Sequence, residues 1–220
     1  MIAASGFRTI LGAVLAAALG TACANGKGAP AVTHDGLELM SGSKVERAYV
    51  KPGEDFKQYT RVGLLDCFVA FKKNWQMNHP NIRTRDMDRI KKALADEFRT
   101  VFAEQLRKGG YPVVTEPAEN VLLVRPAIID LNVVAPDTMS PDSGTTFTAS
   151  AGAMTLYVEL YDSVSNEILA RAIDRRQASN VGNITWTTQG TNMDAARRLL
   201  KRWADLLVAK LDEVHGKPGG

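Results

Sequence analysis

Apolar residues recur every three or four positions in two stretches of the chain, residues 84–110 and 192–216. This spacing places the apolar side chains on one face of a helix. Thr84 is suited to cap the start of the first stretch, and the second stretch ends at Gly216, since glycine commonly ends a helix. The pattern therefore predicts two long amphipathic helices.

Apolar runs rich in β-branched and aromatic residues, which are typical of strands, make up five further stretches. They are residues 61–71, 111–114, 121–134, 153–162 and 167–178. The four residues SVSN between the last two indicate a β-hairpin. Pro126 lacks a backbone N–H and requires a bulge or an edge position in its strand. Together the elements predict one α/β (α+β) domain with a single mixed, mostly antiparallel sheet of four or five strands.

The apolar residues of 61–71 occupy both alternating sets of positions, as in a central strand that is covered on both faces. Two helices can supply one layer each, but if both lie on one side, another segment has to cover the opposite face. We expect segment 37–59 to fold against the sheet and the domain to be a monomer. The apolar cover would come from Leu37, Leu39, Val45, Tyr49 and Phe56.

Residues 1–22 carry one positive charge, at Arg8, and then an apolar run too short to cross a bilayer, which is typical of a secretory signal peptide. The run ends in LGTAC, which resembles the lipobox at which bacterial lipoprotein precursors are acylated on cysteine and cleaved. The resemblance implies that Cys23 is a lipid attachment site, with a diacylglyceryl thioether and an N-acyl chain such as palmitate. The alternative is an ordinary signal peptide cleaved near TACA, which leaves this cysteine unmodified.

Small, polar and glycine-rich residues at 23–36 predict a flexible tether behind the lipidated cysteine. Ala24 stands where, in the sorting rule of Gram-negative lipoproteins, an aspartate favours retention in the inner membrane. The resemblance therefore implies an anchor in the outer membrane. Residues 37–216 are then one periplasmic domain, and residues 217–220 are a disordered tail.

The chain has 27 lysines and arginines against 24 aspartates and glutamates, a formal net charge of +3, with the signs interleaved. Nucleic acid is not an expected partner, because this composition produces no strong positive field. The expected partners are membrane lipid, through acylated Cys23, and an envelope protein or the cell wall. The sequence shows no phosphate-binding loop, no HExxH and no paired-cysteine spacing, so it indicates neither a cofactor nor a metal.

Cys67 has no intramolecular partner if Cys23 is acylated, because the chain contains two cysteines. It lies within the apolar stretch 61–71, and the three histidines occur in the tether, before Pro80 and at the end of the chain. A nucleophilic cysteine needs a base or a positive charge nearby to lower its pKa. A buried structural thiol is therefore the favoured interpretation.

Candidate catalytic groups are few. Ser41 and Lys44 have the SxxK spacing of penicillin-interacting serine enzymes, but the companion SDN and KTG motifs are absent, and we interpret the match as chance. Four carboxylates in or beside predicted strands are candidates for an acid–base pair, if the fold brings two of them together. They are Asp66, Asp130, Glu159 and Asp174.

Alternation along 167–178 puts Arg171 and Arg175 on one face of the hairpin and Asp174 and Arg176 on the other. The first face would meet three residues of the partner strand, Tyr157, Glu159 and Tyr161. Charge pairs on a solvated face are favoured over a ligand site. The long polar loops 135–152 and 180–192 are the other candidates for a partner site, and Trp186 in the second loop either anchors a partner or folds back onto the sheet.

Several segments from residue 37 onward resemble a proteobacterial family of lipoproteins catalogued only as a domain of unknown function. The features that carry the resemblance are YVKPG at 49–53, Trp75, GGYPVV at 109–114 and DRR at 174–176. None of them is a catalytic motif. The resemblance implies a lipid-anchored periplasmic domain, and we expect a binding or scaffold module. The alternative is a periplasmic enzyme that acts on a small envelope substrate.

Overall fold

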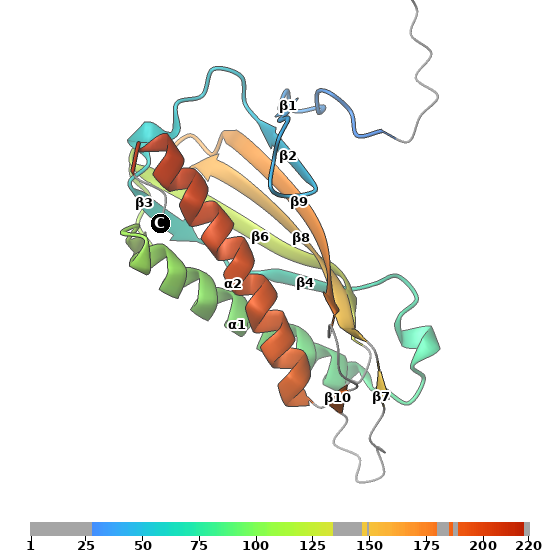
Figure 1. Ribbon diagram of the computed structural model, residues 1–220. Helices are drawn as coiled ribbons and strands as arrows, with labels where there is room; N and C mark the ends of the chain where they lie inside the picture. Colours follow the sequence, from blue (N-terminus) through green and yellow to red (C-terminus); the bar gives the residue numbers. More distant parts are fainter. Residues whose placement is uncertain (1–27, 134–146, 149, 180–184, 187–188, 218–220) are drawn as a thin grey trace, which may run out of the picture.

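The computed structural model describes residues 28–133, 147–148, 150–179, 185–186 and 189–217 (Figure 1). Two long helices lie side by side against one main sheet, and a separate pair of short strands stands near one end of it. The helices are α1 (Thr84–Lys108) and α2 (Gln189–Val214), and two short 3-10 turns interrupt the connections, η1 (Phe56–Gln58) and η2 (Gln76–Asn78).

The main sheet has eight strands in the order β1-β2-β9-β8-β6-β3-β5, and β4 also pairs with β6. Strands β3, β4 and β5 run parallel to their neighbours, whereas the other pairs are antiparallel. The strands are β1 (Glu38–Leu39), β2 (Arg47–Val50), β3 (Arg61–Leu64), β4 (Phe68–Phe71), β5 (Val113–Val114), β6 (Val121–Asn132), β8 (Ser150–Asp162) and β9 (Ile168–Ser179). The separate pair consists of β7 (Phe147–Thr148) and β10 (Thr185–Trp186).

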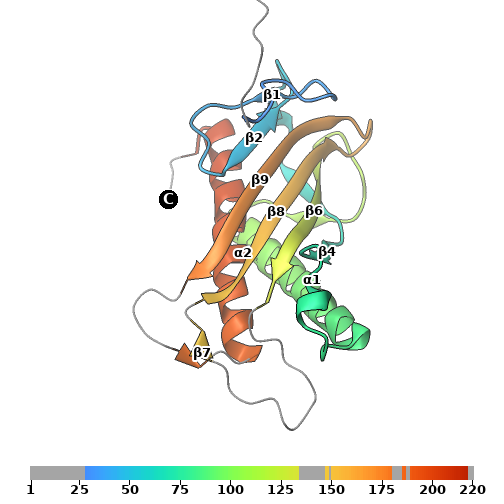
Figure 2. The ribbon, with the colours of Figure 1, turned by 90° about the vertical axis from the view of Figure 1, so that its right-hand side faces the viewer.

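Both helices cover the same face of the main sheet, and no α-helix of the described residues lies on the opposite, helix-free face (Figure 2). The core fills the space between the helices and the sheet. From α1, Phe98 and Phe102 contribute rings that stack with centroids 3.9 Å apart, and α2 contributes Leu200 and Trp203. Among the described residues, neither long helix contains an apolar stretch that could span a bilayer.

The two predicted helices are confirmed, but the predicted count of four or five strands is wrong. Segment 37–59 contributes β1 and β2, because it pairs along the edge of β9 instead of lying across a face of the sheet. Of its expected apolar cover, Leu37 and Tyr49 are buried, whereas Leu39 is exposed. A further strand arises because the predicted strand 61–71 is broken into β3 and β4.

Pro126 on β6 lies opposite this break. The Leu65 N–H donates to the Val124 carbonyl at 3.0 Å, so that carbonyl faces β3. Because strand backbone groups alternate, the nitrogen of Pro126, two residues on, faces the same side and has no proton to donate. In β6, residues 121–124 pair with β3, and residues 127–131 pair with β4. The sheet thus accommodates the proline by interrupting the neighbouring strand, and not by the expected bulge or edge position.

Candidate functional site

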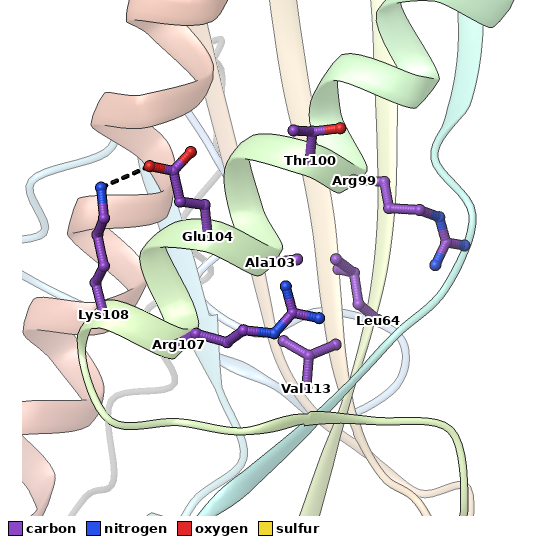
Figure 3. Close-up of a pocket in the computed structure, with 8 residues that line it drawn as sticks. All are labelled: Leu64, Arg99, Thr100, Ala103, Glu104, Arg107, Lys108 and Val113. Carbon is purple, nitrogen blue, oxygen red and sulfur yellow. Dashed lines mark hydrogen bonds and ion pairs between the residues drawn. The ribbon is translucent and has the colours of Figure 1, made fainter.

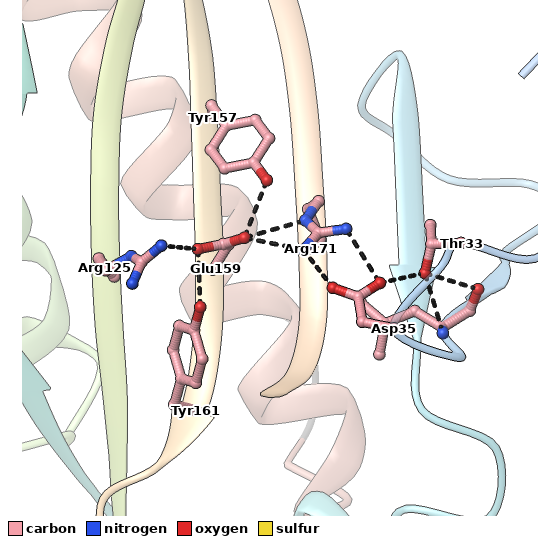
Figure 4. A network of polar contacts seen from close by, with 8 residues as sticks. Thr33, Asp35, Arg125, Tyr157, Glu159, Tyr161 and Arg171 are labelled. Carbon is pink, nitrogen blue, oxygen red and sulfur yellow. Dashed lines mark hydrogen bonds and ion pairs between the residues drawn. The ribbon is translucent and has the colours of Figure 1, made fainter. Parts of the chain in front are cut away.

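The helix-free face of the sheet carries a buried cluster of polar side chains around Glu159, which is 3% exposed (Figure 4). Tyr157 and Tyr161 stand two residues before and after it on β8, so all three side chains point to the same face. Each tyrosine hydroxyl donates to the Glu159 carboxylate at 2.8 Å. Arg171, directly opposite on β9, donates to Glu159 Oε1 from Nε at 3.1 Å and from Nη2 at 2.9 Å. The contact expected from strand alternation is therefore confirmed.

The cluster continues to both sides of this pair. On β6, Arg125 reaches Glu159 Oε2 at 2.7 Å, although most of the arginine side chain is exposed. On the other side, Arg171 also binds the carboxylate of Asp35, with Nη2 2.5 Å from Oδ2, and Thr33 donates to the same carboxylate. The cluster therefore connects β6, β8 and β9 with the segment before β1.

The charges in the cluster are stable at neutral pH. Burial raises the pKa of Glu159, but hydrogen bonds from Tyr161, Tyr157 and Arg171 outweigh it, and the pKa lies below its ordinary value. Burial and the hydrogen bond to Glu159 raise the pKa of Tyr157 to about 12. The Arg171 hydrogen bond lowers the pKa of Asp35 to about 2. Glu159 is thus a charged acceptor that already has four donor groups, an arrangement that holds strands together and is poorly suited to proton transfer.

Asp174 lies on the opposite face of the sheet, toward the helices, and is 1% exposed. Its carboxylate accepts from Trp203 Nε1 on α2 at 2.7 Å, from Arg176 Nε at 2.6 Å and from the Glu46 N–H at 2.9 Å. Asp174 and Arg176 therefore share a face, as predicted. Their cluster fastens α2 and the segment before β2 to β9.

The four candidate carboxylates do not form an acid–base pair. Glu159 and Asp174 occupy opposite faces of the sheet. In the β8–β9 register Asp174 lies opposite Leu156, and Leu156 is three positions before Glu159 on β8, an odd number that places the two side chains on different faces. Asp66 is exposed in the break and pairs with Arg99 of α1. Asp130 is exposed on β6 with a φ of 51°.

Cys67 is a free, buried thiol, as expected, but it lies in the break and not within a strand. Burial raises its pKa to about 12, which is unsuitable for a nucleophile. Ser41 and Lys44 are exposed in the loop between β1 and β2. No group of three histidine, cysteine or acidic residues within the described ranges is placed to hold a metal.

Of two other predicted site residues, the structure does not describe Cys23 and describes only the backbone of Trp186. Cys23 lies outside the described residues, so its acylation stays a prediction. Trp186 lies in β10, opposite Phe147 of β7 in the register of the second sheet, and its side chain is outside the described part.

Exposed apolar residues gather at the break between β3 and β4, and the sequence did not reveal them. Leu65 is 40% exposed and Phe68 is 64% exposed, whereas Cys67 and Val69 are buried. An unbroken strand would put Phe68 on the same face as the buried Leu64. In β4, Val69 pairs with the core residue Ile128 and Phe68 pairs with Ala127, so the break changes the alternation and places Phe68 on the helix-free side. Pro126 was the signal that pointed to an irregularity here, but it lies on another strand.

A pocket of about 570 Å³ opens between α1 and the strands β3 and β5 (Figure 3). Leu64 and Val113 from the strands and Ala103 from α1 give it apolar walls. The other lining residues come from successive turns of α1 and include three cations and one anion. They are Arg99, Thr100, Glu104, Arg107 and Lys108.

The cations that line the pocket differ in their partners. Arg99 pairs with Asp66, and Lys108 pairs with Glu104 at 2.5 Å on the exposed surface of α1. Arg107 has no ion pair or hydrogen bond through its side chain within the described residues, and Figure 3 shows its guanidinium group next to Leu64 and Val113. The pocket therefore has an excess of positive charge next to apolar walls.

Comparison with solved structures finds distant likenesses. The PelC dodecamer from Paraburkholderia phytofirmans is 11% identical, with 70% of this chain and 93% of that chain covered and a TM-score of 0.37. A protein described as a neuraminyllactose-binding hemagglutinin homolog from Helicobacter pylori is 14% identical, with 74% and 91% covered and a TM-score of 0.36. A DUF4136 family protein from Bacteroides thetaiotaomicron is 9% identical, with 76% and 95% covered and a TM-score of 0.34. Likenesses this weak carry no functional information.

Comparison by sequence identifies a family. The model of DUF3313, a protein family of unknown function, matches residues 33–207. The chain therefore belongs to this family, which confirms the expected membership in a family known only as a domain of unknown function. No curated protein matches the chain.

Proposed function

We propose that this member of the DUF3313 family is a lipid-anchored module of the bacterial cell envelope that binds another protein in the periplasm. Two features support the proposal. The first is LGTAC at residues 19–23, behind a signal-like apolar run. The second is the exposed apolar pair Leu65 and Phe68 at the break between β3 and β4.

The exposed pair is the observation that carries the binding role. Phe68 is 64% exposed on the face that neither α1 nor α2 covers (Figure 2), and exposed aromatic residues are common anchors in protein interfaces. The best-placed carboxylate on the same face, Glu159, is already engaged by internal donors. The arrangement therefore favours a binding module over an enzyme.

The proposed anchor would keep the domain close to the membrane. Residues 23–33 separate Cys23 from Thr33, the residue that is fastened to the sheet through Asp35. An extended chain of this length spans at most about 35 Å. The end of the sheet that carries β1 and β2 would then face the bilayer, from a distance smaller than the length of either long helix.

The anchor is tested by Cys23→Ser, which removes the thiol that would be acylated. We expect the wild-type protein to sediment with membranes and the variant to be released with the periplasmic contents, because a diacylated cysteine holds a protein stably in a bilayer. Cys67→Ser is the matched control and should leave fractionation unchanged. Mass spectrometry of the mature wild-type protein with residue 23 unmodified would exclude the anchor.

The binding role is tested by Phe68→Asp in intact cells treated with a short chemical crosslinker. We expect the wild-type protein to form a discrete crosslinked species that Phe68→Asp loses. Met77→Asp is the control, because Met77 is 76% exposed and lies outside the break. Equal loss in both variants, or no effect of either, would count against this surface as the binding site.

A further inference from the structure

We propose that the outer edge of β4 and the pocket beside Leu64 together bind an extended acidic segment of a partner protein, which pairs with β4 as an additional strand. This inference rests on the proposed binding role and specifies the chemistry of the partner. It combines two observations, an open sheet edge and an uncompensated arginine beside it.

The edge is open over several residues. β4 pairs with β6 on one side, and no described strand pairs with its other side. β5 ends at Val114, opposite Gly63, so no described strand lies along the outer side of β4 from Phe68 to Phe71. The sequence of β4, FVAF, contains neither a charge nor a proline, which are the usual means of keeping an edge strand single. The opposite edge of the sheet, β1, has two residues and offers little backbone to pair.

An added strand would lie in line with β5 and alongside β4. Strand side chains alternate between the two faces. One set would therefore point toward the helices, into the pocket between Leu64 and α1. The other set would stand beside Phe68 on the helix-free face, where an aromatic ring stabilises a neighbouring strand by cross-strand contact.

The charge of the pocket selects the partner. Among the described residues, Arg107 lacks a partner and Arg99 pairs with Asp66 alone, which is highly exposed. A carboxylate on the added strand would reach these guanidinium groups next to apolar walls, where water screens the attraction less. Lys108 and Glu104 compensate each other and leave the net excess unchanged.

The same charges disfavour a second copy of this chain as the occupant. Antiparallel pairing of two β4 edges would bring the arginines of both pockets toward one groove, because each α1 flanks its own edge. Like charges placed close together destabilise an interface. An acidic segment from another protein complements the pocket, whereas a homodimer would repeat its charge.

The test uses fluorescence anisotropy with the full chain purified in detergent. The probe is a labelled eight-residue peptide of alternating valine and glutamate, and the control peptide alternates valine and lysine. We expect binding of the acidic peptide, weakening with added salt, and no binding of the basic peptide. Arg107→Ser should weaken binding by roughly tenfold, which corresponds to the loss of one charge-assisted hydrogen bond. Arg85→Ser, also exposed on α1 but far from the pocket in sequence, should not.

Strand pairing is tested with two N-methylated versions of the acidic peptide. One version is methylated at the odd-numbered amides and the other at the even-numbered amides. Alternate amides point to opposite edges of a strand, and only one edge of the peptide can face β4. At least one of the two methylated peptides should therefore fail to bind. If both N-methylated peptides bind as well as the parent, the pocket attracts anions without strand addition, and the proposal is overturned. Equal binding of acidic and basic peptides, or equal effects of Arg107→Ser and Arg85→Ser, would also overturn it.

Failure of this inference can be distinguished from failure of the proposed binding function. If the peptide tests fail while Phe68→Asp still abolishes the crosslinked species in cells, the module binds a partner by another mode, and only the present inference is lost. If the crosslinked species is also insensitive to Phe68→Asp, the binding role of this surface is lost as well.

Discussion

Arg171 stands directly opposite Glu159 in the ladder between β8 and β9, and it donates two hydrogen bonds to one oxygen of that carboxylate. The same guanidinium group reaches Asp35, so one arginine joins two strands of the sheet to the segment that precedes β1. The pair is almost fully buried, with side-chain exposures of 11% and 4%. Through its contact with Asp35, Arg171 fastens the end of the proposed tether to the folded domain.

Glu159→Gln should destabilise the protein by about 2 kcal/mol or more, because it removes one of the two counter-ions of the buried Arg171 and places an amide NH2 group among the hydrogen-bond donors that surround the carboxylate. Glu167→Gln is the matched control. Its ion pair with Lys51, at 2.8 Å, is largely exposed, and its loss should lower the urea midpoint much less. Urea unfolding of both variants gives the comparison. Similar midpoints for the two would show that the buried pair adds nothing beyond a surface contact.

Stability should fall in acid through the carboxylates bound to Arg171. The pKa of Asp35 is about 2 in the folded protein and about 3.9 in an unfolded chain. A lowered pKa contributes stability that is complete above about pH 5 and is lost as the pH falls from about 4 toward 2. The pKa of Glu159 is also lowered in the folded protein, so its protonation in acid reduces stability as well. Urea midpoints measured across this range should decline less steeply in Asp35→Asn, and an identical decline would refute the assignment.

Cys67 should resist thiol reagents in the native protein, because it is buried and its pKa is raised to about 12. The measurement uses a Cys23→Ser background, in which Cys67 is the remaining cysteine. Labelling should be slow until denaturant is added. A cysteine introduced by Val164→Cys, on the exposed hairpin turn, should react at once. Cys67→Ala should cost at most a few kcal/mol, and fast native labelling of Cys67 would contradict its burial.

Gly152→Ala should be much more damaging than Gly36→Ala. Both glycines have positive φ, +112° and +82°, so both alanines carry backbone strain. At Gly152 the new Cβ would also collide with the carbonyl oxygen of Asn132, whereas at Gly36 it would meet open space. We expect a loss of about 1 kcal/mol at Gly36 and about 3 kcal/mol or more at Gly152. Thermal unfolding of the two variants checks the difference.

Much of the fold follows from local signals in the chain. Both helices have long apolar faces of helical period, and the hairpin is marked by SVSN, so each element carries its own evidence. Alternation along β8 and β9 was enough to bring Arg171 to the face of Glu159. These features depend on residues that are near one another in sequence.

The remainder depends on pairings between distant segments. β1 and β2 have two and four residues, which is too short for a period to show, and they form because β9 offers an edge. The break between β3 and β4 lies opposite Pro126 of β6, which is about sixty residues away in the sequence. No local pattern separates 61–71 from one continuous strand. The exposed Phe68 and the open edge, which carry the functional proposals, are consequences of that break.

Hydrogen exchange across β4 is the most direct test of the account. In the full chain alone, the amides of 68–71 that face away from β6 should exchange much faster than those of β8, which is paired on both sides. Addition of the acidic peptide should slow exchange in 65–71 and leave β8 and β9 unchanged. The result that would contradict the account is peptide binding that protects another part of the sheet and leaves β4 open.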